Sequence, residues 1–425
     1  METKYLIIGN AAGGVGATEG LRIADKDGGI TIVSAEPYPA YSRPLIAEYL
    51  TGERDFDGLR YRPAGFYEKN KVETVLGNGA AKLDVAGHSA ELSDGIKVTW
   101  QKLLLATGGL AIMPKTPGME AKGVFTFINL TDAKKIKDYV AGRKIGAVVI
   151  GGGLIGMSVS EALRKCGVRV TIVELKDYIL NTILDAEGGA FAASAVKKAG
   201  VNILTGRTVT KIIAGSDGAV SGVTLDNGAD TLCEMVIFAI GVRPNTTLVN
   251  STGIKVNRGI LVDRHMATNV PDVFACGDVA EAYDFTTGEA RLTPIWPNAY
   301  LGGRIAGCNM AGKAVEYPGG TAMNSLKYFG LEIATAGLTA TLPDGYEAIS
   351  GVNNGTFRKI IIKNGQVAGM VFIGNIEKAG IVFSFMKDKV NVGSFKELLV
   401  AGDLNEAALP EAIYRNKLLP PVTVA

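Results

Sequence analysis

Residues 147–156 read Ala-Val-Val-Ile-Gly-Gly-Gly-Leu-Ile-Gly, an apolar run followed by a glycine-rich turn. A buried strand, a tight turn and a helix in this order predict a Rossmann-type dinucleotide fingerprint. The first glycine makes the turn, the second lets the backbone approach a pyrophosphate, and the third lets the helix pack on the strand. Gly151, Gly153 and Gly156 occupy these places. Leu154 and Ile155 begin the expected helix, whose amides would face the phosphates.

The same pattern occurs earlier, where residues 5–14 read Tyr-Leu-Ile-Ile-Gly-Asn-Ala-Ala-Gly-Gly. Gly9 and Gly14 match the first and third glycines, Ala11 replaces the second, and Ala12 opens the helix. In both copies an Asp-Gly or Asn-Gly pair, at 94–95 and 227–228, then predicts a hairpin. A lone fingerprint is often only a glycine-rich turn, but two copies between a strand and a helix predict two nucleotide-binding modules.

The second predicted strand of each module ends in an acid. Residues 30–36 read Ile-Thr-Ile-Val-Ser-Ala-Glu, and residues 170–174 read Val-Thr-Ile-Val-Glu. A carboxylate here would accept hydrogen bonds from an adenosine ribose, and Glu174 would repel a 2′-phosphate, which favours NADH over NADPH. The alternative is that Glu36 and Glu174 are solvated acids at strand ends.

The character of the sequence changes near residue 316. Beyond it, two strand patterns joined by Asn364-Gly365 and later helical patterns predict a separate α+β domain. We therefore predict an α/β protein with two Rossmann-type, glutathione-reductase-like dinucleotide-binding domains and a C-terminal α+β domain. The expected boundaries are residues 1–113 with 243–315, residues 114–242, and residues 316–425.

Several motifs together resemble a known family. Ala106-Thr107-Gly108, residues 241–245 (Gly-Val-Arg-Pro-Asn) and residues 274–278 (Phe-Ala-Cys-Gly-Asp) resemble the FAD-dependent pyridine nucleotide-disulfide oxidoreductases. Residues 41–44 (Tyr-Ser-Arg-Pro) and 296–299 (Trp-Pro-Asn-Ala) resemble the branch of NADH oxidases, rubredoxin reductases and nitrite reductase flavoproteins. The resemblance covers essentially the whole chain. It implies that the first, discontinuous domain binds FAD and that the second binds NAD(H), with NADP(H) less favoured.

The fingerprints and the resemblance together give the expected site. The resemblance places beside the flavin ring the residues Ser42, Arg43, Pro44 and Trp296. The expected FAD-binding residues are Gly9, Ala11, Ala12, Gly14, Glu36, Arg43, Ala80, Ala106, Thr107, Gly108, Gly277, Asp278 and Pro297. The expected NAD-binding residues are Gly151, Gly153, Leu154, Ile155, Gly156, Glu174, Ile240 and Gly241. Asp278 would hold the ribitol chain. The alternatives without a cofactor are that Asp278 is a solvated loop aspartate, that Arg43 forms a surface ion pair and that Trp296 packs in the core.

The cysteines depart from the pattern of the family. The chain has four, at positions 166, 233, 276 and 308, and no Cys-x-x-Cys. Peroxidase and coenzyme A-disulfide reductase relatives carry one near the flavin, but residues 34–45 here contain none, and Ser42 is the nearest isostere. A hydroxyl forms neither a sulfenic acid nor a disulfide, so these two activities are not expected. Two histidines and scattered cysteines also predict no metal site.

Bulk composition narrows the choice of partners. The formal net charge is +2, which gives no strong field for nucleic acid or a membrane surface. The sequence shows neither a signal-peptide pattern nor an apolar run of membrane-spanning length, so a cytoplasmic location is expected.

We expect an FAD-dependent NAD(P)H oxidoreductase that moves electrons, in either direction, between NADH and a small rubredoxin- or ferredoxin-like iron–sulfur protein. One alternative is an NADH oxidase that makes peroxide. Another is an NADH-sensing flavoprotein whose tail is an interaction module. The resemblance suggests that the tail covers the flavin or forms the subunit contact of a homodimer.

Overall fold

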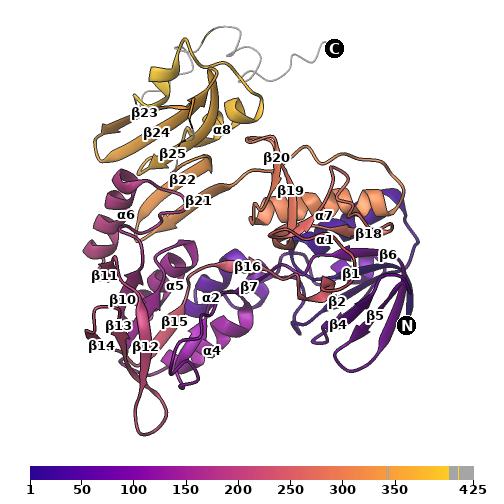
Figure 1. The fold of residues 1–425 in the computed structure, drawn as a ribbon, viewed down its shortest axis with the longest axis horizontal. Coiled ribbons are helices and arrows are strands. Elements are labelled where there is room, and N and C mark those ends of the chain that lie inside the picture. The colour runs from indigo at the N-terminus through magenta and orange to yellow at the C-terminus, as the bar shows by residue number, and fades with distance from the viewer. Residues whose placement is uncertain (341, 343, 402–409, 411–425) are drawn as a thin grey trace. The chain divides into compact units, whose positions relative to one another are not determined.

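The computed structural model describes residues 1–425 except 341, 343, 402–409 and 411–425 (Figure 1). The chain forms two compact units. The first joins Met1–Leu175 to Val201–Thr321, and the second joins Lys176–Gly200 to the described part of Ala322–Ala425. In the described parts of the chain, no helix combines the length and the apolar character needed to cross a membrane.

The first sheet carries the first fingerprint. Its strands follow the order β3-β2-β1-β6-β5-β4, and β18 also pairs with β6. Their bounds are β1 (Glu2–Ile8), β2 (Ile30–Ser34), β3 (Val72–Leu76), β4 (Ala80–Asp84), β5 (Ser89–Leu92), β6 (Lys97–Leu105) and β18 (Val273–Ala275). The pairs β1–β2, β2–β3, β1–β6 and β6–β18 are parallel, and the buried, mostly apolar runs at residues 5–8, 30–33, 103–105 and 273–275 fit a sheet that is covered on both faces. The pairing of β18 brings residues 273–275 into a sheet that begins at residue 2.

The second sheet carries the second fingerprint. Its five parallel strands follow the order β11-β10-β9-β15-β8. Their bounds are β8 (Val124–Thr126), β9 (Gly146–Ile150), β10 (Arg169–Glu174), β11 (Asn202–Thr205) and β15 (Met235–Phe238). A smaller antiparallel sheet contains β12 (Val209–Ala214), β13 (Val220–Leu225) and β14 (Asp230–Leu232). Both predicted hairpins are confirmed, since residues 94–95 join β5 to β6 and residues 227–228 join β13 to β14.

Helices α1 (Ala12–Ala24) and α7 (Trp296–Met310) pack backbone against backbone in the first unit (Figure 1). A Cβ atom on Gly303 would lie 2.0 Å from the carbonyl oxygen of Gly13, and one on Gly20 would lie 2.1 Å from that of Arg304. Equally close approaches occur at Gly16 and Gly307. Glycines four residues apart in each helix therefore let the two backbones touch, as small residues do wherever helices approach closely.

Short elements complete the first unit. Strand β7 (Gly109–Ala111) pairs antiparallel with β16 (Val242–Pro244), so the two chain segments that join the sheets run side by side. The helices that flank the sheets are α2 (Ile46–Thr51), α3 (Phe66–Lys69), α4 (Leu130–Val140) and α5 (Leu154–Lys165). The 3-10 turns are η1 (Arg43–Leu45), η2 (Asp57–Leu59), η3 (Thr247–Val249) and η4 (Gly277–Val279). The remaining strands are β17 (Ile260–Leu261), β19 (Ala280–Asp284) and β20 (Glu289–Arg291).

The second unit is built on a five-stranded antiparallel sheet of order β21-β22-β25-β24-β23. Its elements are α6 (Ala186–Lys198), β21 (Met323–Tyr328), β22 (Leu331–Gly337), β23 (Glu347–Asn353), β24 (Thr356–Lys363), β25 (Gln366–Ile373), α8 (Ala379–Lys387) and η5 (Lys396–Leu399). Residues 364–365 form the predicted hairpin between β24 and β25. Asp185 and Lys359 form an ion pair of 2.6 Å, and the rings of Phe191 and Phe357 stack. Helix α6 thus packs with the tail, although the sequence boundaries placed it in residues 114–242.

Candidate functional site

The two fingerprint turns have the backbone that a dinucleotide site needs. Gly9 and Gly151 have φ angles of +123° and +105°, which side chains rarely allow. A Cβ on Gly156 would lie 1.9 Å from the carbonyl oxygen of Gly151, and one on Gly14 would lie 2.1 Å from that of Gly9. At Gly153, by contrast, a Cβ would meet no described atom within 4 Å. That side of the turn is open, as the approach of a pyrophosphate requires.

The helices with predicted cofactor contacts, α1, α5 and α7, start without a side-chain cap from the N-cap residue. Their N-cap residues, Ala11, Gly153 and Ile295, make no side-chain cap hydrogen bond, and none of these first turns contains an acid. Helices α4 and α6, in contrast, are capped by Asn129 and Asp185. Uncapped amides and the positive end of the helix dipole attract phosphates and other anions. Helices α2, α3 and α8 also lack such a cap, but only α1, α5 and α7 begin at motifs that predicted cofactor contacts, and their N-termini fit a dinucleotide.

Four of the predicted FAD motifs meet around the start of α1. A Cβ on Gly13 would lie 2.8 Å from Sγ of Cys276, 3.4 Å from Cβ of Ala106 and 3.6 Å from the carbonyl oxygen of Ala299. These neighbours belong to the Gly-Asp motif, the Ala-Thr-Gly turn and the N-terminal turn of α7. The structure therefore brings together segments that are up to 286 residues apart in the sequence.

Asp278 lies in η4, beside this meeting point, and is half-buried. No described residue donates a hydrogen bond to its carboxylate, although burial raises the pKa of Asp278 and the positive charge of Arg43 only partly opposes that rise. A half-buried carboxylate without a donor is costly, and it is suited to accept from the hydroxyls of a ligand. This site fits the ribitol chain of FAD.

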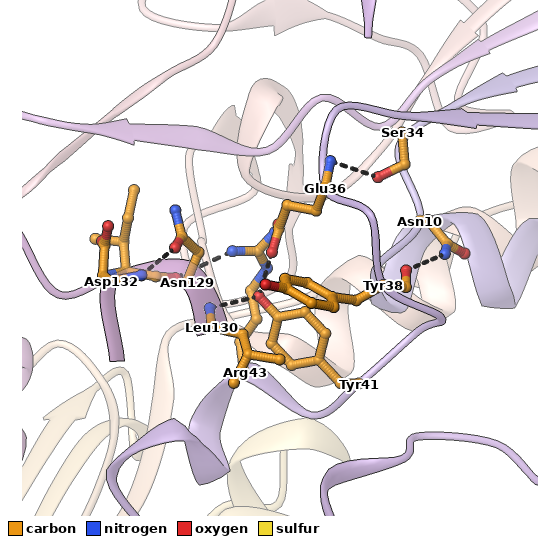
Figure 2. Close-up of polar contacts among 10 residues, drawn as sticks. Asn10, Ser34, Glu36, Tyr38, Tyr41, Arg43, Asn129, Leu130 and Asp132 are labelled. Carbon is orange, nitrogen blue, oxygen red and sulfur yellow. Dashed lines mark hydrogen bonds and ion pairs between the residues drawn. The ribbon is translucent and has the colours of Figure 1, made fainter. Parts of the chain in front are cut away.

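Glu36 is the centre of a polar network (Figure 2). Its carboxylate accepts a hydrogen bond of 2.6 Å from the hydroxyl of Tyr41 and forms an ion pair with Arg43. Arg43 also donates to the carbonyl oxygen of Ile128 at 3.0 Å, and the Tyr41 hydroxyl accepts from the amide of Leu130 at 2.9 Å. The network therefore connects the first module to the start of α4 in the second.

The two acids do not occupy equivalent places in their modules. Val33 pairs with Ile8 as Val173 pairs with Ile150, so Ser34 corresponds to Glu174. Strand β2 accordingly ends at Ser34, two residues before Glu36, and the expectation that each strand ends in an acid is wrong for the first copy. The Ser34 hydroxyl accepts from the amide of Glu36 at 3.2 Å. Glu36 therefore reaches its place from a turn rather than from the strand.

Glu174 lies at the end of β10 and is buried. Its carboxylate accepts a hydrogen bond of 2.7 Å from the amide of Gly152, inside the second fingerprint turn. Ile240 approaches the same turn, with its Cα 3.1 Å from the place of a Cβ on Gly151. Gly241 follows with a φ angle of +127°. The predicted NAD-binding residues are thus neighbours at the carboxyl ends of β9, β10 and β15, where ligands of such sheets bind.

The other predicted residues are placed as follows. Trp296 begins α7, is half-buried and meets the ring of Tyr61 edge-on at 4.9 Å, and the exposed Pro297 follows it. Thr107 donates to the carbonyl oxygen of Asn245 at 2.8 Å. Ser42 directly precedes η1, in which Arg43 and Pro44 lie, and its side chain makes no cap hydrogen bond there. Ala80 begins β4 beside Gly79, where a Cβ would lie 3.1 Å from that of Ala35. Ala80 therefore follows a residue that contacts the turn before Glu36.

Sequence reasoning missed three members of the network. Tyr41 is part of the motif at residues 41–44, and no sequence pattern singles out Ile128 or Leu130. Tyr41 is buried at 5% exposure, and this burial raises the pKa of its hydroxyl, so the hydroxyl stays protonated and can donate to Glu36. The only signal for this role was an aromatic residue two positions before Arg43.

Glu174 leads to a prediction about the choice of nicotinamide cofactor. In Glu174→Gln, the amide oxygen can still accept from Gly152, but the negative charge that repels a 2′-phosphate is lost. We expect the ratio of KM for NADPH to KM for NADH to fall about tenfold, since this is the effect of about 1.4 kcal/mol. Glu234→Gln is the matched control, because Glu234 accepts from the amide of Gly146 at the opposite end of β9. Equal changes in the two variants would contradict the assignment.

Comparisons with known proteins agree with this geometry. Residues 3–304 match the family model of pyridine nucleotide-disulphide oxidoreductases, and residues 323–390 match that of the rubredoxin NAD+ reductase C-terminal domain. The chain is 30% identical to NADH-dependent phenylglyoxylate dehydrogenase subunit epsilon of Aromatoleum evansii, over 95% of this chain and 96% of that protein. It is also 30% identical to NADH-rubredoxin oxidoreductase of Clostridium acetobutylicum, over 79% of this chain and 82% of that protein.

A solved structure of NADH:rubredoxin oxidoreductase from Clostridium acetobutylicum has a TM-score of 0.76 at 27% identity, with coverage of 94% of this chain and 99% of that chain. The matches confirm the predicted fold class and the predicted kind of enzyme, an FAD-dependent oxidoreductase that uses NAD(P)H. The chain belongs to the pyridine nucleotide-disulphide oxidoreductase family, and its tail matches the rubredoxin NAD+ reductase C-terminal domain.

Proposed function

We propose that this chain transfers electrons between NADH and a small iron–sulfur protein of the rubredoxin or ferredoxin type. Two similarities support the acceptor class: the relative named NADH-rubredoxin oxidoreductase, and the match of residues 323–390 to the C-terminal domain of rubredoxin NAD+ reductase. The relative from Aromatoleum evansii, which aligns over 96% of its length, is named as a subunit of an NADH-dependent dehydrogenase, and this favours an acceptor held in a complex.

In this proposal the chain binds, orients and tunes the two cofactors. Bound FAD would supply the chemistry, taking a hydride from NADH and giving up electrons one at a time. The uncapped starts of α1 and α5 would hold the two pyrophosphates, and Asp278 the ribitol chain. The uncapped start of α7 would direct its amides at the flavin edge, where they stabilise negative charge. Ser42, Arg43, Pro44 and Trp296 would line the flavin ring.

The observation that best supports an acceptor outside the chain is the burial of the cysteine thiols. Cys233, Cys276 and Cys308 are buried, and Cys166 is half-buried. Burial raises the pKa of Cys276 to about 12, and the charge of Asp278 adds to that rise. Burial likewise raises the pKa of Cys233 to about 12. Burial also raises the pKa of Cys166 and Cys308, and because only a thiolate reacts with a disulfide or a peroxide, none of the four thiols is expected to react at neutral pH. Electrons that reach the flavin therefore need an acceptor outside the chain.

An anaerobic titration tests the proposal. NADH is added to the purified holoenzyme while the visible absorbance of the flavin is followed, and rubredoxin, a [2Fe–2S] ferredoxin or air is then added. We expect stoichiometric bleaching by NADH, fast recovery with an iron–sulfur protein and slow recovery in air. Fast recovery in air alone would instead establish an NADH oxidase, and persistence of the reduced state with every acceptor would indicate an NADH sensor.

Cys276→Ala is the matched variant for this experiment. We expect it to keep the rate of electron transfer to the iron–sulfur protein within about twofold of wild type, because the thiol takes no part in the transfer. The small change in volume at a buried position costs about 1 kcal/mol of stability. Loss of transfer to the acceptor in a variant that still bleaches with NADH would show that Cys276 relays electrons, and the proposal would be wrong.

The proposal also includes the domain boundaries and the assembly expected from the sequence. Residues 1–113 with 243–315 would bind FAD, residues 114–242 would bind NADH, and residues 316–425 would form the contact of a homodimer in the cytoplasm. Part of that last segment lies outside the described residues. Light scattering of the full chain checks the dimer, and a monomer at micromolar concentration would contradict it.

A further inference from the structure

One face of α4 is held by tyrosines of the first module. Leu130, Lys134 and Lys137 are spaced at i, i+4 and i+7, so they lie on the same side of the helix. The Lys134 ammonium lies 4.2 Å from the ring centre of Tyr38. The Lys137 ammonium lies 4.5 Å from the ring centre of Tyr49 and donates to the carbonyl oxygen of Tyr49 at 2.9 Å.

The third contact differs from the other two because it involves the backbone. The Tyr41 hydroxyl accepts from the amide of Leu130, the first residue of α4, at 2.9 Å. First-turn amides lack partners within their own helix, so this bond acts as a cap supplied by another module. It stands beside the cap from Asn129, which accepts from the amide of Asp132 at 2.8 Å (Figure 2).

Glu36 determines where the Tyr41 hydroxyl points. A hydroxyl that donates to Glu36 presents its lone pairs elsewhere, and here they face Leu130. Glu36 also orients Arg43, whose other nitrogen donates to Ile128, two residues before α4. Tyr41 and Arg43 hold the Glu36 side chain in place. The side chain is 21% exposed, so it also remains accessible to a ligand.

We propose that the Glu36–Tyr41–Arg43 network is a latch that couples occupancy of the FAD site to the order and position of α4 in the nicotinamide module. This inference rests on the proposed FAD site, in which Glu36 meets the adenosine ribose. A ribose hydroxyl that donates to Glu36 fixes the carboxylate. The ordered carboxylate then holds the side chains of Tyr41 and Arg43, and their hydrogen bonds to Leu130 and Ile128 hold the start of α4 in position. Tyr41 is then a positioning residue that acts on the second module through the amide of Leu130.

Hydrogen exchange of the full chain tests the latch, because local opening of α4 exposes its amides. Exchange is measured for apoprotein and for protein reconstituted with FAD, in wild type and in Tyr41→Phe. In wild type we expect FAD to slow exchange at residues 34–45 and at residues 128–137. In Tyr41→Phe, FAD should still slow exchange at 34–45, but the protection factor at 128–137 should fall about tenfold in the holoprotein and no longer depend on FAD.

Tyr139→Phe is the matched control. Tyr139 also lies on α4, but its hydroxyl donates to the carbonyl oxygen of Glu234, within the nicotinamide module. This variant should loosen α4 equally with and without FAD, so the FAD-dependent difference should remain. The latch is disproved if FAD still protects α4 in Tyr41→Phe, or if wild type shows protection at 34–45 without any at 128–137. Absence of protection at both places would instead show that FAD does not bind at Glu36, and the proposed site itself would be wrong.

Discussion

Gly303→Ala is expected to remove tight FAD binding and to destabilise the first unit. The new Cβ would lie 2.0 Å from the carbonyl oxygen of Gly13 and 2.9 Å from its Cα, which are backbone atoms of α1 that no rotamer change can move. Helices α1 and α7 must therefore separate, and overpacking of this kind costs about 3 kcal/mol. Both helices present uncapped N-termini to the proposed cofactor. A displacement of roughly 1 Å at such a site lowers its performance about 100-fold, and we expect FAD affinity to fall by that factor.

Gly302→Ala is the matched control for that loss. It lies on the same helix, one residue away, and its Cβ would meet the flexible end of Met266 at 3.1 Å instead of a backbone atom. Alanine is also the better helix former by about 1 kcal/mol, so stability should stay within about 1 kcal/mol of wild type. Fluorescence titration with FAD and urea unfolding of both apoproteins measure the two effects. Equal losses in the two variants would show that close packing of α1 and α7 does not determine the site.

The glycines of α1 and α7 show which features of the fold the sequence could predict and which it could not. The fingerprint glycines were recognised because each has a chemical reason to be small. Gly16 with Gly20, and Gly303 with Gly307, show the four-residue spacing of close helix contacts, but nothing in a single sequence says that these two segments meet. That pairing depends on β18 joining β6, a contact between strands about 170 residues apart. Periodicity predicts elements, whereas partners so distant along the chain come from the tertiary fold.

The polar network was hidden for a related reason. The sequence predicts an acid at the end of the second strand in each module. It could not show that β2 ends at Ser34, the equivalent of Glu174, and that Glu36 lies two residues further on, in a turn. Nor could it show that the hydroxyl of Tyr41 reaches the start of α4, because the length of a side chain does not say which module it will touch. Helix α6 gives a similar lesson at the level of domains. The boundaries expected from the sequence include the crossover between β10 and β11 in residues 114–242, yet its helix packs with the tail.

Asp278→Asn is expected to have opposite effects on stability and on cofactor binding. No described residue donates to the carboxylate, so its burial is a cost to the apoprotein. Removing the charge should stabilise the apoprotein by about 1 kcal/mol. FAD would lose a charge-assisted hydrogen bond to its ribitol chain, and its affinity should fall about 10- to 100-fold. Urea unfolding of the apoprotein and titration with FAD measure the two quantities. A variant that is both less stable and unchanged in FAD affinity would contradict the assignment of Asp278.

The stability difference also has a predictable pH dependence. Because burial raises the pKa of Asp278 in the folded state, the folded protein binds the proton more tightly than the unfolded chain does. The cost of the charge is therefore complete above the raised pKa and disappears as pH falls below the ordinary pKa of an aspartate. Wild type and Asp278→Asn apoproteins should converge in stability as the solution is acidified.

Asp94→Asn provides the contrast, since a hydrogen bond from Asn78 lowers the pKa of Asp94 and its charge is stabilising. That exposed variant should be slightly less stable than wild type above the ordinary aspartate pKa, with unchanged affinity for FAD. Asp278, whose pKa is raised by burial, should show the reverse sign together with the loss of FAD affinity.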